Sequence, residues 1–308
     1  SVGARIESLT TEAWDGTSNG ADLVFHTTYD ETQGEVARFK SGGNVFIPPT
    51  HRIYLDGGSN TYIYESESDM ISLSTNNTIR LSLDNNSRIS LSNNDSGGTG
   101  NTIFGKNCAD GFDDGEHDNV VIGDQAAESQ SHDSTENNVL IGFQACTGGT
   151  GSRNNSVAIG YQAWGNGGSA NNIGGAENVF LGSLSGNGTW ATGASDSNTA
   201  VGYSTMAGAM NGAANNTAVG RSAMATIITG DGNVAIGGYS MDDTDAHANT
   251  GASENNVFVG FHSGGGTWAA TQTDNAIGIG AYALYGALDN VDGTVAIGGN
   301  ALQQLTSG

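Results

Sequence analysis

The sequence is short of basic residues, of proline and of long apolar runs. Its 308 residues include 9 lysines and arginines against 32 acidic residues, which gives a formal net charge of −23. Phosphate contacts need cations, so we expect no nucleic-acid partner. The 2 prolines and 49 glycines follow no Gly-X-Y period, which excludes collagen and argues against a proline-rich linker. No apolar run reaches the roughly 18 residues of a membrane helix, and we expect no membrane insertion.

Cysteine and charge are scarce as well. Cys108 and Cys146 are the two cysteines. They are too few for a disulfide framework, and we expect both to be small buried side chains. Only 13% of the residues are charged, which is not the composition of an ordinary disordered tail.

A five-residue phrase of the type Asn-Val-Ala-Ile-Gly recurs eleven times between Asn101 and Gly298. Its glycines lie 17 to 23 residues apart, and a period near 20 is typical of a repeat architecture. The residue before the glycine and the one two positions earlier share one face of a strand, while the residue between them, often alanine, faces the other way. The pattern predicts an all-β chain with a β-solenoid, or β-roll, of about eleven coils over residues 101–308.

Each repeat is anchored by its glycine, which suits a tight bend or a positive φ, and by the apolar residue before it. In ten copies these anchors are Ile122 and Gly123, Ile141 and Gly142, Ile159 and Gly160, Leu181 and Gly182, Val201 and Gly202, Val219 and Gly220, Ile236 and Gly237, Val259 and Gly260, Ile279 and Gly280, and Ile297 and Gly298.

The strands of the repeats are apolar on both faces, so both faces should be covered. One face can fill the interior of the coil, and the other requires a second layer or a second chain. The sequence does not distinguish the two faces. We expect an unpaired charge in the repeated apolar face, as in Ile159→Asp, to prevent folding.

The first hundred residues lack the repeat and have a different pattern of apolar and polar residues. Residues 1–50 form an N-terminal β segment in which runs such as Val36–Phe39 predict strands. Residues 51–100 contain strands of three to five residues with alternating apolar and polar positions, for example Ile79–Leu83. Strands this short bury too little alone, which favours a narrow shaft built by several chains. Residues 93–100 are the expected boundary to the solenoid.

Part of the solenoid is duplicated. The loop that carries Trp190 matches the loop that carries Trp268, 78 residues later, and the coil spacings around the two loops agree. A second copy of the block should run beyond Gly308, so we expect a truncated or processed product.

Two features of the sequence resemble known families. The segment Asn155–Ala163 resembles the head repeats of trimeric autotransporter adhesins, and Asn198–Tyr203 resembles the Asn-Thr-Ala-Val-Gly-Tyr repeats of bacteriophage tail fibres. Arg52–Glu65 is similar to a segment common in tail fibres of large marine phages, and Leu23–Thr28 also looks like fibre sequence. Together with the repeats these stretches cover roughly 250 residues.

The resemblance implies a parallel homotrimer of interwound β-rolls in the extracellular tail fibre of a virion. It also implies attachment to a bacterial cell-surface receptor, either a glycan or an outer-membrane protein, without catalysis. The inserted loops depart from the shorter, more uniform repeats of adhesin heads. Two alternatives stay open, namely a tailspike enzyme that degrades polysaccharide and the head of a bacterial adhesin.

The candidate ligand-binding residues are Trp164, Trp190 and Trp268. A tryptophan in a loop offers a flat apolar face on which a sugar can stack, although such rings also pack over a coil edge or into a seam between chains.

Two acidic runs, Asp113–Asp118 and Asp242–His247, allow three interpretations: a solvated loop, a calcium site, or the paired carboxylates of a glycosidase. The solvated loop is favoured. The sequence therefore nominates no catalytic residue, metal site or cofactor.

Overall fold

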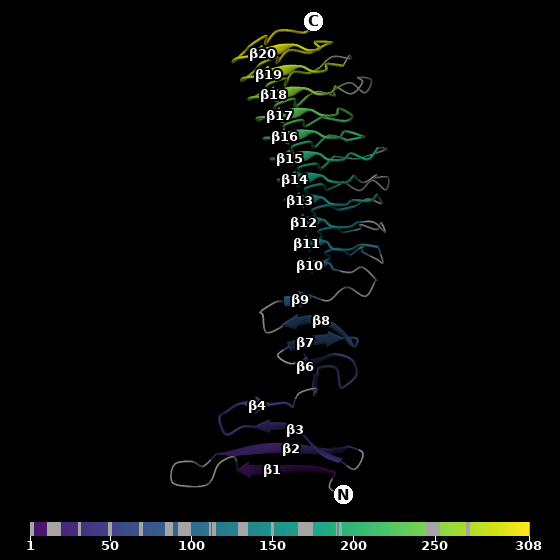
Figure 1. Cartoon of the computed structure of the whole chain (residues 1–308), viewed down its shortest axis with the longest axis vertical. Coiled ribbons are helices and arrows are strands. Elements are labelled where there is room, and N and C mark those ends of the chain that lie inside the picture. The colour runs from purple at the N-terminus through teal and green to yellow at the C-terminus, as the bar shows by residue number, and fades with distance from the viewer. Residues whose placement is uncertain are drawn as a thin grey trace. The chain divides into compact units, whose positions relative to one another are not determined.

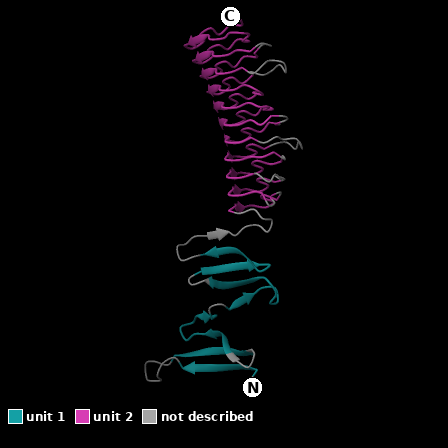
Figure 2. Cartoon of the chain, turned by 45° about the vertical axis from the view of Figure 1, so that its right-hand side comes forward, with its two compact units in different colours: residues 1–92 teal, residues 93–308 magenta. Residues whose placement is uncertain are grey.

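The computed structural model of the chain describes residues 3–10, 20–29, 32–48, 51–67, 70–83, 89–91, 100–110, 112, 115–128, 135–148, 151–165, 175–188, 190, 193–243, 253–268 and 272–307. These residues form strands and turns without a helix, which confirms the all-β class. The chain divides into two compact units, unit 1 at residues 1–92 and unit 2 at residues 93–308 (Figure 2).

Unit 1 contains two antiparallel sheets in which each strand pairs with the next along the chain. The first sheet has the order β1 (Ala4–Thr10), β2 (Ala21–Tyr29), β3 (Thr32–Phe39) and β4 (Val45–Phe46). The second has the order β5 (Arg52–Tyr54), β6 (Tyr62–Glu67), β7 (Met70–Thr75), β8 (Thr78–Leu83) and β9 (Ile89–Leu91).

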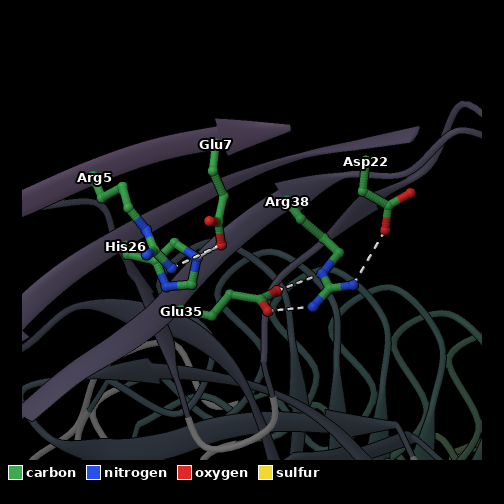
Figure 3. Close-up of polar contacts among 6 residues, drawn as sticks. All are labelled: Arg5, Glu7, Asp22, His26, Glu35 and Arg38. Atoms are coloured by element: carbon green, nitrogen blue, oxygen red, sulfur yellow. Dashed lines mark hydrogen bonds and ion pairs between the residues drawn. The ribbon is translucent and has the colours of Figure 1, made fainter. Parts of the chain in front are cut away.

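The first sheet carries charged side chains on one face. The guanidinium of Arg38 donates to the carboxylates of Glu35 and Asp22, and on neighbouring strands Glu7 accepts from Arg5 and pairs with His26 (Figure 3). Side chains alternate along a strand, so the opposite face is apolar. It contains Ile6, Leu23, Phe25, Phe39 and Val45, and Ile6 is 66% exposed.

The second sheet repeats this division. Ser72 and Ser82 are buried on one face, where their hydroxyls lie 2.9 Å apart. The other face is a row of aliphatic residues set by the register, and the exposed side chains Ile53, Ile71 and Leu83 belong to it. Both sheets of unit 1 therefore have an apolar face that a single chain leaves largely uncovered.

Unit 2 is a parallel β-solenoid, as predicted. Its eleven strands pair in sequence order, one from each repeat (Figure 1). They are β10 (Thr102–Phe104), β11 (Val120–Ile122), β12 (Val139–Ile141), β13 (Val157–Ile159), β14 (Val179–Leu181), β15 (Thr199–Val201), β16 (Thr217–Val219), β17 (Val234–Ile236), β18 (Val257–Val259), β19 (Ile277–Ile279) and β20 (Val295–Ile297).

The anchor glycines permit the close stacking of these coils. All eleven have φ between +124° and +149°, a region that side chains disfavour. From Gly105 to Gly280, an added Cβ would lie within about 2.6 Å of the backbone carbonyl group of the next anchor glycine. Any other residue at this position would have to push two coils apart.

The interior of each coil is filled by two positions that compensate in size. One is the middle residue of the strand, and the other is the fourth residue after the anchor glycine. Where the strand has Phe180, the other position is Gly186, and where the strand has Ala158 the other is Trp164. Such pairs of a large and a small side chain are what close packing of a core requires. It recurs in the pairs Ala200 and Met206, Ala218 and Met224, Ala235 and Met241, Phe258 and Gly264, and Gly278 and Leu284.

A column of buried asparagines joins the coils at the start of each strand. Asn198 donates from its backbone and side-chain nitrogens to Oδ1 of Asn178, and in turn accepts both kinds of bond from Asn216. Its side-chain nitrogen also donates to the carbonyl of Ala213 at 2.8 Å. The column consists of Asn101, Asn119, Asn138, Asn178, Asn198, Asn216, Asn233 and Asn256, with Ser156 in the fourth place.

The apolar anchors before the glycines point out of the coil. Ile159 is 36% exposed, whereas its neighbour Ala158 is fully buried. Our expectation that Ile159→Asp prevents folding assumed a buried face, and in a single chain this face is half-exposed. An aspartate there would remain in contact with water, so the substitution should act on whatever covers the face rather than on the coil itself.

Candidate functional site

The three candidate tryptophans lie inside the coils. Trp164, Trp190 and Trp268 are each 1% exposed. Trp164 and Trp190 have ring centroids 5.6 Å apart, and both contact Phe180. The candidate role in ligand stacking is therefore corrected and the packing alternative holds, because rings packed in this way offer no free face to a ligand.

Trp268, in the second copy of the duplicated loop, has the same packing environment as Trp190 in the first copy. It contacts Phe258 at 5.7 Å and donates from Nε1 to the carbonyl of Gly264 at 2.8 Å. Phe258 and Gly264 are the counterparts of Phe180 and Gly186, and in both coils the absence of a side chain on the glycine leaves room for the phenylalanine ring. Trp190 packs on Phe180 and Trp268 packs on Phe258. The repeated tryptophan is a packing element of the coil.

The acidic runs are described only in part, because Asp113, Asp114 and residues 244–247 lie outside the described residues. Among the described residues no group of three or more His, Cys, Asp or Glu could hold a metal ion. In the second run, Asp243 accepts a hydrogen bond from the Thr267 hydroxyl.

Asp242, in the second run, has a partly buried carboxyl. Burial raises the pKa of its carboxyl to about 6. Its Oδ1 atom is buried without a hydrogen-bond partner, as is Nδ1 of His262. Both atoms lie beside Gly265, since an added Cβ there would be 2.8 Å from Oδ1 and 3.2 Å from Nδ1.

The two cysteines differ in burial. Cys146 is fully buried, and its sulfur accepts from the guanidinium of Arg153 at 3.1 Å. Cys108 is partly buried, and burial raises the pKa of both thiols. A raised pKa disfavours the thiolate, so neither residue has the character of a reactive cysteine.

A column of exposed rings, which the sequence-based predictions did not include, follows the anchor glycines. Phe143 and Tyr161 directly follow their glycines and stack at 5.7 Å with an interplanar angle of 12°. Further along, the guanidinium of Arg221 lies 5.8 Å from the ring of Tyr203 and 5.5 Å from that of Tyr239.

The column widens into a cluster on the coils of β17, β18 and β19. We define the aromatic cluster as Tyr239, Phe261, His262, Tyr282 and Tyr285. His262 is stacked between Tyr239 at 4.9 Å and Tyr282 at 5.4 Å, with interplanar angles of 10° and 14°. Phe261 is 47% exposed and meets the edge or face of its neighbours at 4.4 to 6.0 Å.

The widest candidate surface is the outward face of the eleven-stranded sheet. Its rows contain the first and third residues of each strand, nearly all Val, Ile, Leu or Thr. Side chains in these rows are partly or largely exposed from β11 to β20, whereas those of the middle row are buried. Among the described residues no helix is long and apolar enough to cross a membrane.

Comparisons with family models, with curated proteins and with solved structures find no match to the chain. The candidate surfaces are therefore interpreted from their own chemistry.

Proposed function

We propose that the chain is a structural and receptor-binding segment of a bacteriophage tail fibre, assembled as a parallel homotrimer and attached to a bacterial cell surface. Its role is non-enzymatic: the coils and sheets provide a rigid support, and side chains and loops on their surface make the contacts with the receptor. Three identical contacts in one assembly would multiply a weak single contact.

The observation that carries this proposal is the exposed apolar face that recurs in all three sheets. Soluble monomers rarely expose contiguous apolar patches of more than a few hundred Å², and larger ones mark interaction sites. In unit 2 the face continues over eleven strands, and in unit 1 it is present on each sheet. A second copy of the same chain is the simplest cover, because an identical face repeats with the same coil spacing.

The parallel arrangement follows from the repeats themselves. Strands in unit 2 stack in one direction with unbroken register, so two copies that run the same way would present apolar rows at matching heights. The number three comes from the resemblance to trimeric fibres and adhesin heads. A closed ring of three chains would cover each outward face with the faces of the other two.

Native mass tests the assembly. Light scattering on purified protein should give about three times the chain mass of 31.3 kDa. The double variant Ile159→Asp/Val201→Asp places charges on the outward face and should give monomers that keep β-sheet circular dichroism. Lys106→Asp, at an exposed position of the same unit, is the control and should remain trimeric. A wild-type chain that is a stable monomer would end the proposal.

Attachment is tested separately, with fluorescently labelled protein on a panel of Gram-negative cells. Binding to at least one strain, lost with the monomeric double variant, is the expected result. Release of new reducing ends from surface polysaccharide would instead favour the polysaccharide-degrading alternative.

A further inference from the structure

We infer that the aromatic cluster of unit 2 is a binding platform for an uncharged oligosaccharide. The inference deepens the proposed function, since it rests on a receptor-binding role and names the site and the ligand class. The tryptophans first nominated for sugar stacking are buried, and the aromatic cluster is the largest set of surface-accessible rings that contact one another among the described residues.

The cluster presents one largely open ring, Phe261, which is 47% exposed, beside rings that cover one another. His262 lies parallel to Tyr239 and Tyr282, which belong to the coils before and after its own. Tyr285 closes one side of the stack through edge contacts with His262 and Tyr282 at 5.6 and 5.4 Å. Rings held by one another lose little freedom when a ligand binds, and tyrosine combines an apolar face with a polar hydroxyl. A pyranose likewise has an apolar C–H face and a hydroxyl edge.

The cluster is not a by-product of the repeats. In several other coils one or both of the two positions after the anchor glycine contain polar residues, for example Lys106, Asn107, Asp124, Gln125, Ser204, Ser222 and Asn300. A contact between identical chains should repeat in each coil, as the outward Val and Ile rows do. Single rings also follow the anchor glycines of other coils, at Phe143, Tyr161 and Tyr203. Among the described residues of unit 2, only the coils of β17, β18 and β19 bring more than two surface rings into contact, which points to a local ligand.

Charge restricts the ligand class. Only three of the nine basic residues lie in unit 2. Arg153 among them is buried, and the guanidinium of Arg221 lies 5.5 Å from the ring of Tyr239. Asp242 and Asp243 lie close to the cluster, because Oδ1 of Asp242 and Nδ1 of His262 meet beside Gly265. Asp242 and Asp243 offset the cation of Arg221, so the surface does not favour a polyanionic sugar. Burial lowers the pKa of His262, which disfavours its cationic form. An uncharged chain of sugars is the ligand that this surface admits.

The test uses saturation-transfer NMR with three soluble probes: maltohexaose, chitohexaose and hexagalacturonate. We expect transfer to the ring C–H protons of at least one uncharged probe, and little to hexagalacturonate. The variant Tyr239→Ser/Tyr282→Ser should bind about tenfold more weakly or worse, as expected for the loss of an aromatic anchor. Serine occupies the same position in Ser204 and Ser222, with the same left-handed backbone, so the coils should tolerate it.

The control is Phe143→Ser/Tyr161→Ser, which removes the stacked pair from the same column three coils or more away. It should leave binding unchanged. Equal loss in both variants, transfer to neither uncharged probe, or preference for hexagalacturonate would overturn the inference. Dissociation of the assembly by Tyr239→Ser/Tyr282→Ser would also overturn it, because the cluster would then be a contact between chains.

Cell binding separates this inference from the proposed function. If wild-type protein and the Tyr239→Ser/Tyr282→Ser variant attach equally to the same cells, the fibre role stands and the cluster is not its binding site. If neither attaches while sugar transfer depends on the cluster, the site stands and the attachment role fails.

Discussion

Units 1 and 2 differ in how they bury their apolar side chains. In unit 2 the chain returns over each strand, and the coils enclose a buried interior whose residues run from Ala109 to Ala296. In unit 1 the sheets are single hairpin layers, and among the described residues the buried apolar side chains are Val24 and Tyr62. Parallel coils make a core within one chain, whereas hairpins of this length need another layer.

The difference predicts unequal dependence on assembly. In the proposed trimer, loss of the neighbouring chains would expose the outward rows of the coils in unit 2 but nearly all the apolar surface of unit 1. The predictions that follow test whether unit 2 is held by its own interior and unit 1 by charged and intermolecular contacts.

The largest effect is expected from the size reciprocity inside a coil. Phe180→Ala should lower the free energy of unfolding by about 3–5 kcal/mol, because Gly186 leaves the space unfilled. The double variant Phe180→Ala/Gly186→Met recreates the combination of Ala200 and Met206 and should recover a large part of the loss. Denaturant melts followed by tryptophan fluorescence measure both. Phe143→Ala, at an exposed ring, is the control, and an equal loss there would contradict an internally stabilised coil.

The asparagine column comes next in size. Asn198→Ala leaves the backbone N–H of Asn216 and the carbonyl of Ala213 buried without partners, and we expect a loss of about 2–3 kcal/mol. Asn256→Ala should cost less, since the next position of the column is Ala276, which makes one bond to Asn256 in place of two. Thermal melts compare the variants, and equal losses would mean that the column is not cooperative.

A smaller, pH-dependent effect is expected at Asp242. A carboxyl whose folded pKa is raised to about 6 favours folding below its unfolded pKa, and that contribution is lost as the pH rises through 6. Asp242→Asn should therefore stabilise unit 2 by about 1 kcal/mol at pH 8, after allowance for partial solvent screening, and have little effect at pH 4. A stabilisation that is equal at both pH values would assign the effect to packing.

Unit 1 should respond to acid in the opposite sense. Hydrogen bonds from the Ser41 backbone and from Arg38 lower the pKa of Asp22, and the Arg38 hydrogen bond lowers that of Glu35 (Figure 3). Their contribution is present above the unfolded values near 4 and is lost as the pH falls. Hydrogen exchange should show the first sheet losing protection below pH 4 while the coils keep theirs. Arg38→Gln should weaken that dependence.

The sequence predicted the solenoid because its signal is periodic and local: the Val-x-Ile-Gly phrase defines the strand and the bend in each repeat. It could not assign the faces, because a strand with apolar residues on both sides looks the same whichever side is inward. Trp164 was misplaced for a related reason. It has φ of +49°, and this left-handed position turns a loop residue into the coil interior.

The aromatic cluster was missed because its members are far apart in sequence. Tyr239, His262 and Tyr282 meet only when each is counted from its own anchor glycine. All three are the second residue after that glycine, so the signal was present in the frame of the repeat. A comparison of the residues at the same position after each anchor glycine would have revealed the cluster.

The asparagine column has a direction, and that direction matches the order in which a ribosome makes the chain. Each completed coil presents an unfilled Oδ1 acceptor, and the coil that follows donates to it twice, as Asn216 does to Asn198. A newly made coil can therefore pair with the coil before it, whose Oδ1 acceptor is already in position. The solenoid can grow by one coil at a time from its N-terminal end, without waiting for distant parts of the sequence to be synthesised.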